Sequence, residues 1–215
     1  MIRRRELLLS IPVLALAQAE SETWNFDRFD RVGDHPARVY GTPRLISTPL
    51  GKAIEFDGVE DAMFIEKHPL EGVSTFTWEV IFKPYAGGRP EQRFFHMQES
   101  GSVNRLLMET RLIGDSWCLD TFAASSTGQQ TLIDRKLLHP MDAWYHLALV
   151  YDGKQLRHYV NHKLEVQADV ALAPQKAGET SVGVRYNRVD YFRGAILKAR
   201  MTRRALSLDE FLPNP

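Results

Sequence analysis

The stretch from Trp144 to Lys163 (WYHLALVYDGKQLRHYVNHK) constrains the fold more than any other part of the chain. Up to Tyr151 it alternates with a period of two residues, which is the period of a β-strand. Asp152-Gly153 then interrupts the run with a pair typical of tight turns, and the alternation resumes beyond it. A two-stranded hairpin this apolar needs a second sheet to pack against. The stretch therefore predicts a β-sandwich.

The rest of the chain repeats this pattern in short segments. The clearest is Ser74–Pro84, in which Phe76, Trp78, Val80 and Phe82 face one way. Further strands are predicted at 23–27, 37–40, 53–56, 62–65, 93–98, 105–112, 116–123, 130–134, 164–170, 180–186 and 192–202, and the remainder of 28–49 is predicted to be loop. Short strands without a helical stripe indicate an all-β fold in a single domain, residues 20–215.

One helical turn is predicted near the C-terminus. Ser207 and Glu210 have the spacing of a capping box, in which each residue satisfies a backbone amide of the other. No helix longer than this is indicated anywhere in the predicted domain.

The first nineteen residues have the features of an export signal. Arg3–Arg5 form a basic start, Leu7–Ala17 is an apolar run, and Ala17-Gln18-Ala19 is a small-x-small cleavage site. The apolar run is shorter than the roughly 20 residues that span a bilayer, so an uncleaved anchor is the less favoured alternative. The sequence therefore predicts a signal peptide at residues 1–19. The mature chain would begin at Glu20 and act in the periplasm, at the cell surface or outside the cell.

The net charge of the mature chain is expected to be close to zero. The full sequence has 27 basic and 27 acidic residues, and without Arg3–Arg5 and Glu6 the balance is 24 to 26. Nucleic-acid binding needs a basic face, so no nucleic-acid partner is expected, and charge alone gives no attachment to a membrane. Cys118 is the only cysteine and has apolar neighbours, which predicts a buried thiol and no internal disulfide.

Four short segments occur in a recognisable order. They are Trp24-x-Phe26-Asp27, Gly51–Gly58 (GKAIEFDG), Trp144–Asn161 (W-x-H-x-A-x-V-Y-D-G…Y-V-N), and Phe192-x-Gly194-x-Ile196 followed by Arg204–Ser207. Together they resemble the laminin-G-like group of the concanavalin A-like lectin/glucanase superfamily, over residues 23–212. The resemblance implies a jelly-roll β-sandwich of two antiparallel sheets, one of them curved.

Two positions depart from the pattern of that group. Asn161-His162 stands where Asn-Gly is usual, and because glycine alone accepts positive φ without a steric penalty, this turn is expected to be strained or of another type. Leu197 and Lys198 stand where an acidic pair is usual. Neither can supply carboxylate oxygens to a hard metal ion, so a family calcium site built on that pair is not expected.

No established catalytic motif is present. Glycanases of the superfamily place two carboxylates close together in an E-x-D-x-x-E run, which this sequence lacks. Glu109 and Asp120 are weak catalytic candidates, because they would meet if their strands formed a hairpin. The alternative is that both are solvated, with Glu109 screened by Arg111. His96 and His146 lie on different predicted strands and could form part of a site only if those strands presented them on one face. The alternative is that both are structural histidines whose hydrogen bonds are satisfied within the protein.

Sugar binding calls for an exposed aromatic ring with polar groups around it. Strand alternation leaves two arrangements open. In one, Glu109, Arg111, Trp117 and Thr121 share a face; in the other, which is favoured, Trp117 is a core residue and Asp120 points outward. The candidate ligand-binding residues are His96, Glu109, Arg111, Trp117 and Asp120.

Calcium is the metal best matched to the loops, although no metal ligand is assigned. The acids that could supply oxygens fall in two groups, Asp27 with Asp30 and Asp34, and Asp57 with Glu60 and Asp61. Asp27 and Asp57 are the weak candidates for a structural calcium site. Solvated turn acids are the alternative.

These observations predict a secreted, non-catalytic binding module that recognises a glycan or an extracellular protein. One alternative is a polysaccharide-degrading enzyme, a hydrolase or a lyase, that uses Glu109 and Asp120 on the same fold. Another is a structural envelope or adhesion protein without a small ligand. The fold alone does not choose between them.

Overall fold

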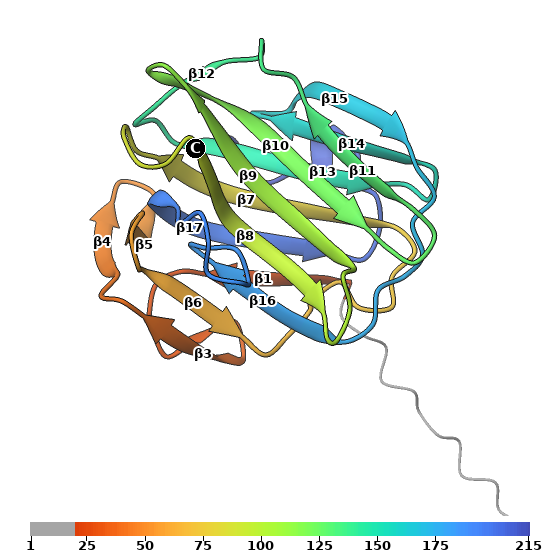
Figure 1. Cartoon of the computed structure of the whole chain (residues 1–215), viewed down its shortest axis with the longest axis horizontal. Helices are drawn as coiled ribbons and strands as arrows, with labels where there is room; N and C mark the ends of the chain where they lie inside the picture. The colour runs from red at the N-terminus through yellow and green to blue at the C-terminus, as the bar shows by residue number, and fades with distance from the viewer. Residues whose placement is uncertain (1–19) are drawn as a thin grey trace, which may run out of the picture.

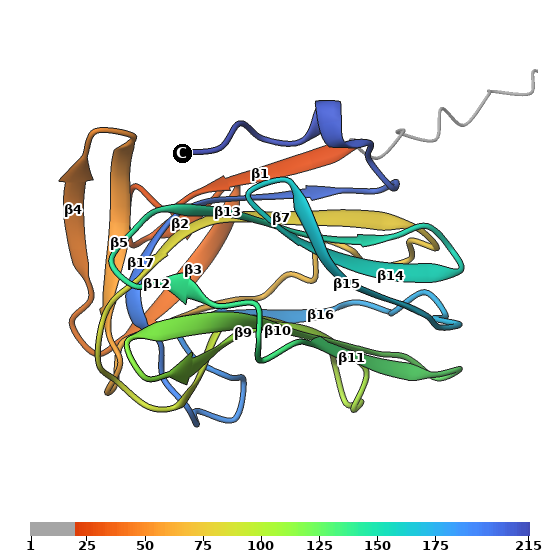
Figure 2. The ribbon, with the colours of Figure 1, turned by 90° about the horizontal axis from the view of Figure 1, so that it is seen from above.

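The computed structural model describes residues 20–215, so the predicted signal peptide at 1–19 lies outside the described residues. Two antiparallel sheets pack face to face (Figures 1 and 2). This arrangement confirms the predicted all-β jelly-roll sandwich. Within the described part of the chain, no helix is long and apolar enough to cross a bilayer.

The first layer is an eight-stranded sheet. Its strand order is β15-β14-β13-β7-β17-β5-β4, and β1 also pairs with β17. Its strands are β1 (Ser21–Asn25), β4 (Arg44–Thr48), β5 (Gly51–Asp57), β7 (Phe76–Pro84), β13 (Tyr145–Tyr151), β14 (Gln155–Val160), β15 (Lys163–Asp169) and β17 (Arg193–Thr202).

The second layer is a nine-stranded sheet. Its strand order is β11-β10-β9-β8-β16-β6-β3-β2, and β12 also pairs with β10. Its strands are β2 (Arg31–Val32), β3 (His35–Tyr40), β6 (Ala62–Ile65), β8 (Glu91–Glu99), β9 (Arg105–Ile113), β10 (Ser116–Ala124), β11 (Gln129–Ile133), β12 (His139–Pro140) and β16 (Gly178–Val182).

The core lies between the two sheets and is rich in aromatic rings. Phe82 of β7 is fully buried at its centre, stacked on Phe94 at 4.6 Å between ring centroids and edge-on to Trp117 at 5.2 Å. The predicted hairpin is formed by β13 and β14 and lines the same core, in which Leu147 and Leu149 are fully buried. The sequence pattern of this hairpin is therefore explained by its packing on the second sheet.

Three parts of the chain differ from the sequence prediction, and one of them is the two-residue strand β12 (His139–Pro140), which was not predicted. The segment 28–49 contains β4 and β2 as well as the predicted strand, because β4 is a half-exposed edge strand whose residues lack a clear alternation. The strand predicted at 180–186 ends at Val182, because Gly183 has φ +82° and turns the chain out of the sheet. The segment 183–192 then runs along the outer face of the nine-stranded sheet (Figure 2), and only its last residue, Phe192, returns to the core between the sheets.

The turn at Asn161-His162 keeps the tight hairpin geometry without a glycine. Its φ values are +47° and +65°, and positive φ at both central residues is the mark of a type I′ turn. Local contacts offset the strain: Asn161 Oδ1 accepts a hydrogen bond from the His146 amide, and the His162 ring hydrogen-bonds the Leu212 carbonyl at 2.8 Å.

The C-terminal segment covers the outer face of the eight-stranded sheet (Figure 2). It holds the 3-10 turn η1 (Leu208–Glu210), which begins with the predicted capping box between Ser207 and Glu210. Phe211 follows the turn and packs on His146 and Tyr159. The predicted helical turn is confirmed, and it anchors the end of the chain to the sheet.

Candidate functional site

Charged side chains follow adjacent strands on the outer face of the nine-stranded sheet. Arg93 on β8, Glu109 on β9 and Asp120 on β10 are directly opposite one another in the ladder. Arg111 lies two residues beyond Glu109 and therefore on the same face. We call these four residues the charged row. The hairpin of β9 and β10 thus brings Glu109 and Asp120 together, as the sequence allowed.

The charged row is a network of ion pairs. Arg111 joins both acids, with Nε 2.7 Å from Asp120 Oδ2 and one terminal nitrogen 3.0 Å from Glu109 Oε2. Arg93 Nε lies 3.1 Å from Glu109 Oε2. Arg111 and Arg93 also pair with Glu91 at the edge of the row, and Arg93 pairs with Asp190 from the segment 183–192. Four carboxylates thus surround two guanidinium groups.

The network is largely shielded from water but incompletely hydrogen-bonded. The Glu109 and Asp120 side chains are 5% and 4% exposed, and those of Arg93 and Arg111 are 11% and 13% exposed. Asp120 Oδ1 is buried without a hydrogen-bond partner among residues 20–215. Glu91 is 47% exposed and marks the open side of the row. Buried polar atoms without hydrogen-bond partners are costly.

Burial raises the pKa of both acids of the charged row. Burial, reinforced by the nearby Asp120 charge and opposed by Arg93 and Arg111, raises the pKa of Glu109 to about 7. Burial also raises the pKa of Asp120, although its hydrogen bond from Arg111 opposes the shift. Near neutral pH, Glu109 therefore holds a proton in part of the molecules. The row can both donate and accept hydrogen bonds.

Two of the predicted ligand-binding residues require correction. Trp117 is fully buried among core aromatics on the inner face of β10, because it is one residue out of phase with Cys118 and Asp120. It cannot join the charged row. His96 lies on the outer face, but it is only 1% exposed and its Nδ1 accepts a hydrogen bond from the Tyr186 amide. His96 is therefore covered by the segment 183–192, and its Nε2 has no partner in the described chain.

His96 and His146 do not meet. His96 lies on β8 of the nine-stranded sheet, whereas His146 lies on β13 of the eight-stranded sheet. His146 is fully buried, and its Nε2 lies 3.0 Å from Glu79 Oε1. The sequence could not assign these histidines to one sheet or the other, because strand order depends on long-range pairing.

The acids proposed for calcium have other partners. Asp57 Oδ1 accepts hydrogen bonds from the amides of Val59, Glu60 and Asp61, and these bonds lower the pKa of Asp57 against the opposing effect of burial. Asp27 is paired with Arg28 at 3.3 Å. Across residues 20–215, no three His, Cys, Asp or Glu side chains are grouped in a way that would hold a metal ion. The geometry gives the calcium hypothesis no ligand set.

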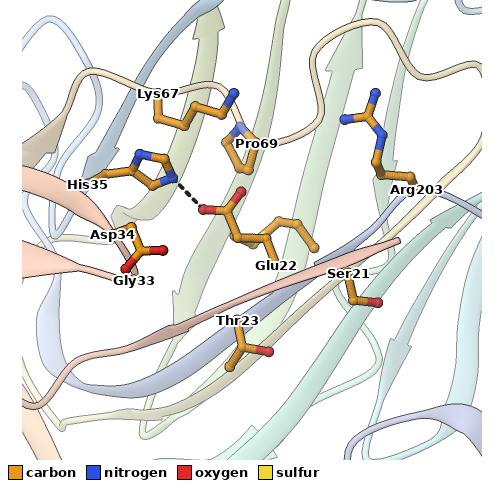
Figure 3. A pocket seen from close by; sticks show the side chains of 10 residues that line it. Ser21, Glu22, Thr23, Gly33, Asp34, His35, Lys67, Pro69 and Arg203 are labelled. Atoms are coloured by element: carbon orange, nitrogen blue, oxygen red, sulfur yellow. Dashed lines mark hydrogen bonds and ion pairs between the residues drawn. The ribbon is translucent and has the colours of Figure 1, made fainter. Parts of the chain in front are cut away.

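A second candidate site is a cavity of about 370 Å³ that the sequence did not reveal (Figure 3). We call it the rim pocket, because it lies where the start of β1 and the end of β17 meet the β2–β3 turn and the loop after β6. Its lining residues are Ser21, Glu22, Thr23, Gly33, Asp34, His35, Lys67, Pro69, Met201 and Arg203. These come from four separate stretches of the chain, so no sequence motif marks the pocket.

Comparison with known proteins identifies the family. The family model described as the concanavalin A-like lectin/glucanases superfamily, in its laminin-G group, matches residues 57–211. No curated protein matches the chain in sequence. Domain 4 of AbnA, a GH43 extracellular arabinanase from Geobacillus stearothermophilus solved with arabinotriose, superposes with a TM-score of 0.64 at 18% identity. The match covers 89% of this chain and 97% of that domain.

Other solved structures share the fold with similar TM-scores. The heptameric SAP-like pentraxin from Limulus polyphemus has a TM-score of 0.58 at 18% identity, covering 73% of this chain and 77% of the pentraxin. The binding domain of botulinum neurotoxin DC, solved with SialylT, has a TM-score of 0.61 at 11% identity. That match covers 88% of this chain and 49% of the toxin domain, so this chain spans about half its length. Since the family model covers well over half of its residues, the chain belongs to the laminin-G-like group of the concanavalin A-like lectin/glucanase superfamily.

Proposed function

We propose that the protein is an exported, non-catalytic module that binds a glycan at the charged row. The observation that carries the proposal is the row itself, in which two guanidinium groups bridge carboxylates of β9 and β10, and in which Asp120 Oδ1 has no partner among residues 20–215. Planar groups of this kind suit adjacent sugar hydroxyls, which donate and accept at once. Two structural relatives, solved with arabinotriose and with SialylT, support a glycan as the ligand class.

Substitutions of acidic residues in and beside the charged row test whether it binds the glycan. We expect Glu91→Gln and Asp120→Asn each to weaken glycan binding by about five- to thirtyfold, because each removes a charged acceptor worth about 1–2 kcal/mol. Both changes preserve shape, and Glu91 is 47% exposed, so its variant should fold normally. Affinity electrophoresis through native gels that contain different polysaccharides measures the effect.

Asp169→Asn is the matched control, because Asp169 is 63% exposed on β15 in the other sheet. Its mobility should equal that of the unaltered protein in every gel. If the Glu91 and Asp120 variants also kept full retardation, the charged row would not be the binding site.

A catalytic role has one observation in its favour. Glu109, with its pKa raised to about 7, stands opposite Asp120, and a protonated acid beside a second carboxylate is the pairing that glycoside hydrolysis uses. A catalytic role is disfavoured because Arg93 and Arg111 both form ion pairs with the Glu109 carboxylate, which would have to be free to reach a substrate. Release of reducing ends from any retarding polysaccharide, lost in Glu109→Gln, would favour the enzyme; unchanged release in that variant would exclude Glu109.

A further inference from the structure

We propose that the rim pocket binds an acidic sugar residue, one that carries a carboxylate or a sulfate, of the glycan ligand. The inference rests on the proposed function for its ligand class but uses a site apart from the charged row. Three features carry it: a carboxylate held in a fixed orientation, two cations that line the same cavity, and a cavity volume of about 370 Å³, which is within the range of small-ligand pockets (about 300–1,000 Å³).

Glu22 is the oriented carboxylate. Its Oε1 accepts hydrogen bonds from the Trp24 indole and the His35 imidazole, each at 2.6 Å. The Trp24 residue is fully buried, so this support is rigid. Figure 3 shows the second oxygen of Glu22 turned toward the side of the pocket that holds Lys67 and Pro69. A carboxylate oxygen fixed in this way accepts sugar hydroxyls without a further loss of side-chain entropy.

Lys67 and Arg203 supply the positive charge. The Arg203 guanidinium donates to the Glu71 carbonyl oxygen. Among residues 20–215 no carboxylate comes within the 4.0 Å of an ion pair with it, so its charge is uncompensated. Lys67 lines the cavity and pairs with the Glu71 side chain at 3.2 Å. An ammonium group has three donors, and this pair uses one of them.

The arrangement selects for ligands with two kinds of group. Arg203 attracts an anion, and Lys67 adds ammonium donors, although the charge of Lys67 is shared with Glu71. Glu22 and Asp34, in contrast, repel an anion and accept hydroxyl protons instead. A neutral sugar would leave the Arg203 charge uncompensated, and a bare inorganic anion would meet the Glu22 charge. A sugar ring that carries an acidic group satisfies both sides of the pocket.

The test compares acidic and neutral polysaccharides in affinity electrophoresis. Polygalacturonate presents carboxylates, dextran sulfate presents sulfates, and arabinan is neutral. We expect retardation in one of the acidic gels, weakened by added salt, and weakened at least about tenfold in Arg203→Gln and in Lys67→Gln. Arg203→Lys should keep part of the retardation, because it retains the charge. Thermal unfolding of each variant checks that it is folded.

Lys154→Gln is the matched control, since it removes one positive charge from a side chain that is 84% exposed at the β13–β14 turn. If the three glutamine variants behaved alike, retardation would be a general charge effect and the inference would be wrong. Retardation by arabinan alone would also overturn the inference while leaving the proposed function intact. No retardation in any gel would overturn both.

Discussion

We expect the folded protein to lose about 3 kcal/mol of stability between pH 6.5 and pH 4.5 because of buried neutral histidines. Burial, aided by nearby positive charge, lowers the pKa of His96 and of His158 from 6.5 to about 3. Below pH 6.5 the unfolded chain therefore binds at least two protons that the folded chain excludes, because burial also lowers the pKa of His68 and of His146. Each excluded proton costs about 1.4 kcal/mol per pH unit.

Glu109 opposes this loss over part of the range. Its folded pKa of about 7 lies above the ordinary 4.5, so between these values the folded state holds more protons than the unfolded state and gains stability in acid. For His96, His158 and Glu109 together, the net difference above pH 4.5 is then about one proton, which gives the 3 kcal/mol. Below pH 4.5 the Glu109 contribution is complete, and the dependence should steepen to more than two protons, because carboxyl groups with lowered pKa values, such as Glu79 and Glu210, then add to the effect of the histidines.

Urea unfolding at a series of pH values, followed by tryptophan fluorescence, measures this dependence. His158→Gln should flatten the slope by about one proton, whereas Glu109→Gln should steepen it between pH 4.5 and 7. These opposite changes separate the two groups even if both variants are less stable at neutral pH. A stability that stayed level from pH 6.5 to 4.5 in all three proteins would contradict the expectation.

The second large effect concerns Glu79 on β7, which ties the C-terminal segment to the eight-stranded sheet. Its fully buried carboxylate binds the His146 imidazole at 3.0 Å, the Leu212 amide at 2.6 Å and the Arg200 guanidinium. Burial alone would raise the pKa of Glu79, yet these hydrogen bonds hold it below its ordinary value. We expect Glu79→Ala to lower the free energy of unfolding by about 3–5 kcal/mol, because the Arg200 charge loses its partner.

Glu66→Ala is the matched comparison for that variant. Glu66 pairs with Arg38 at 3.0 Å, but its side chain is 70% exposed, and surface pairs of this kind contribute about 0–1 kcal/mol. Urea unfolding should therefore separate the two alanine variants by at least about 2 kcal/mol. Equal losses would mean that the Glu79 network adds no more than a surface pair.

The charged row was predictable from the sequence only in part. Glu109 and Asp120 were predicted to meet if β9 and β10 formed a hairpin, and they do. Arg93 was not singled out, although it stands in a strand with the same alternation, because its position beside Glu109 depends on the β8–β9 register. A bulge between Arg93 and Phe95 shifts that register, and no local sequence pattern predicts the bulge.

The sequence by itself determined most of the strands, the first hairpin, the capping box and the family, because each depends on neighbours within a few residues or on a short motif. Tertiary structure decided the strands without clear alternation, the sheet in which each histidine lies and how four distant stretches line the rim pocket. The reason is physical: a shift of one residue in strand register moves every side chain to the opposite face. Register is settled by long-range packing such as that of Phe82 on Phe94 and Trp117, not by local preference.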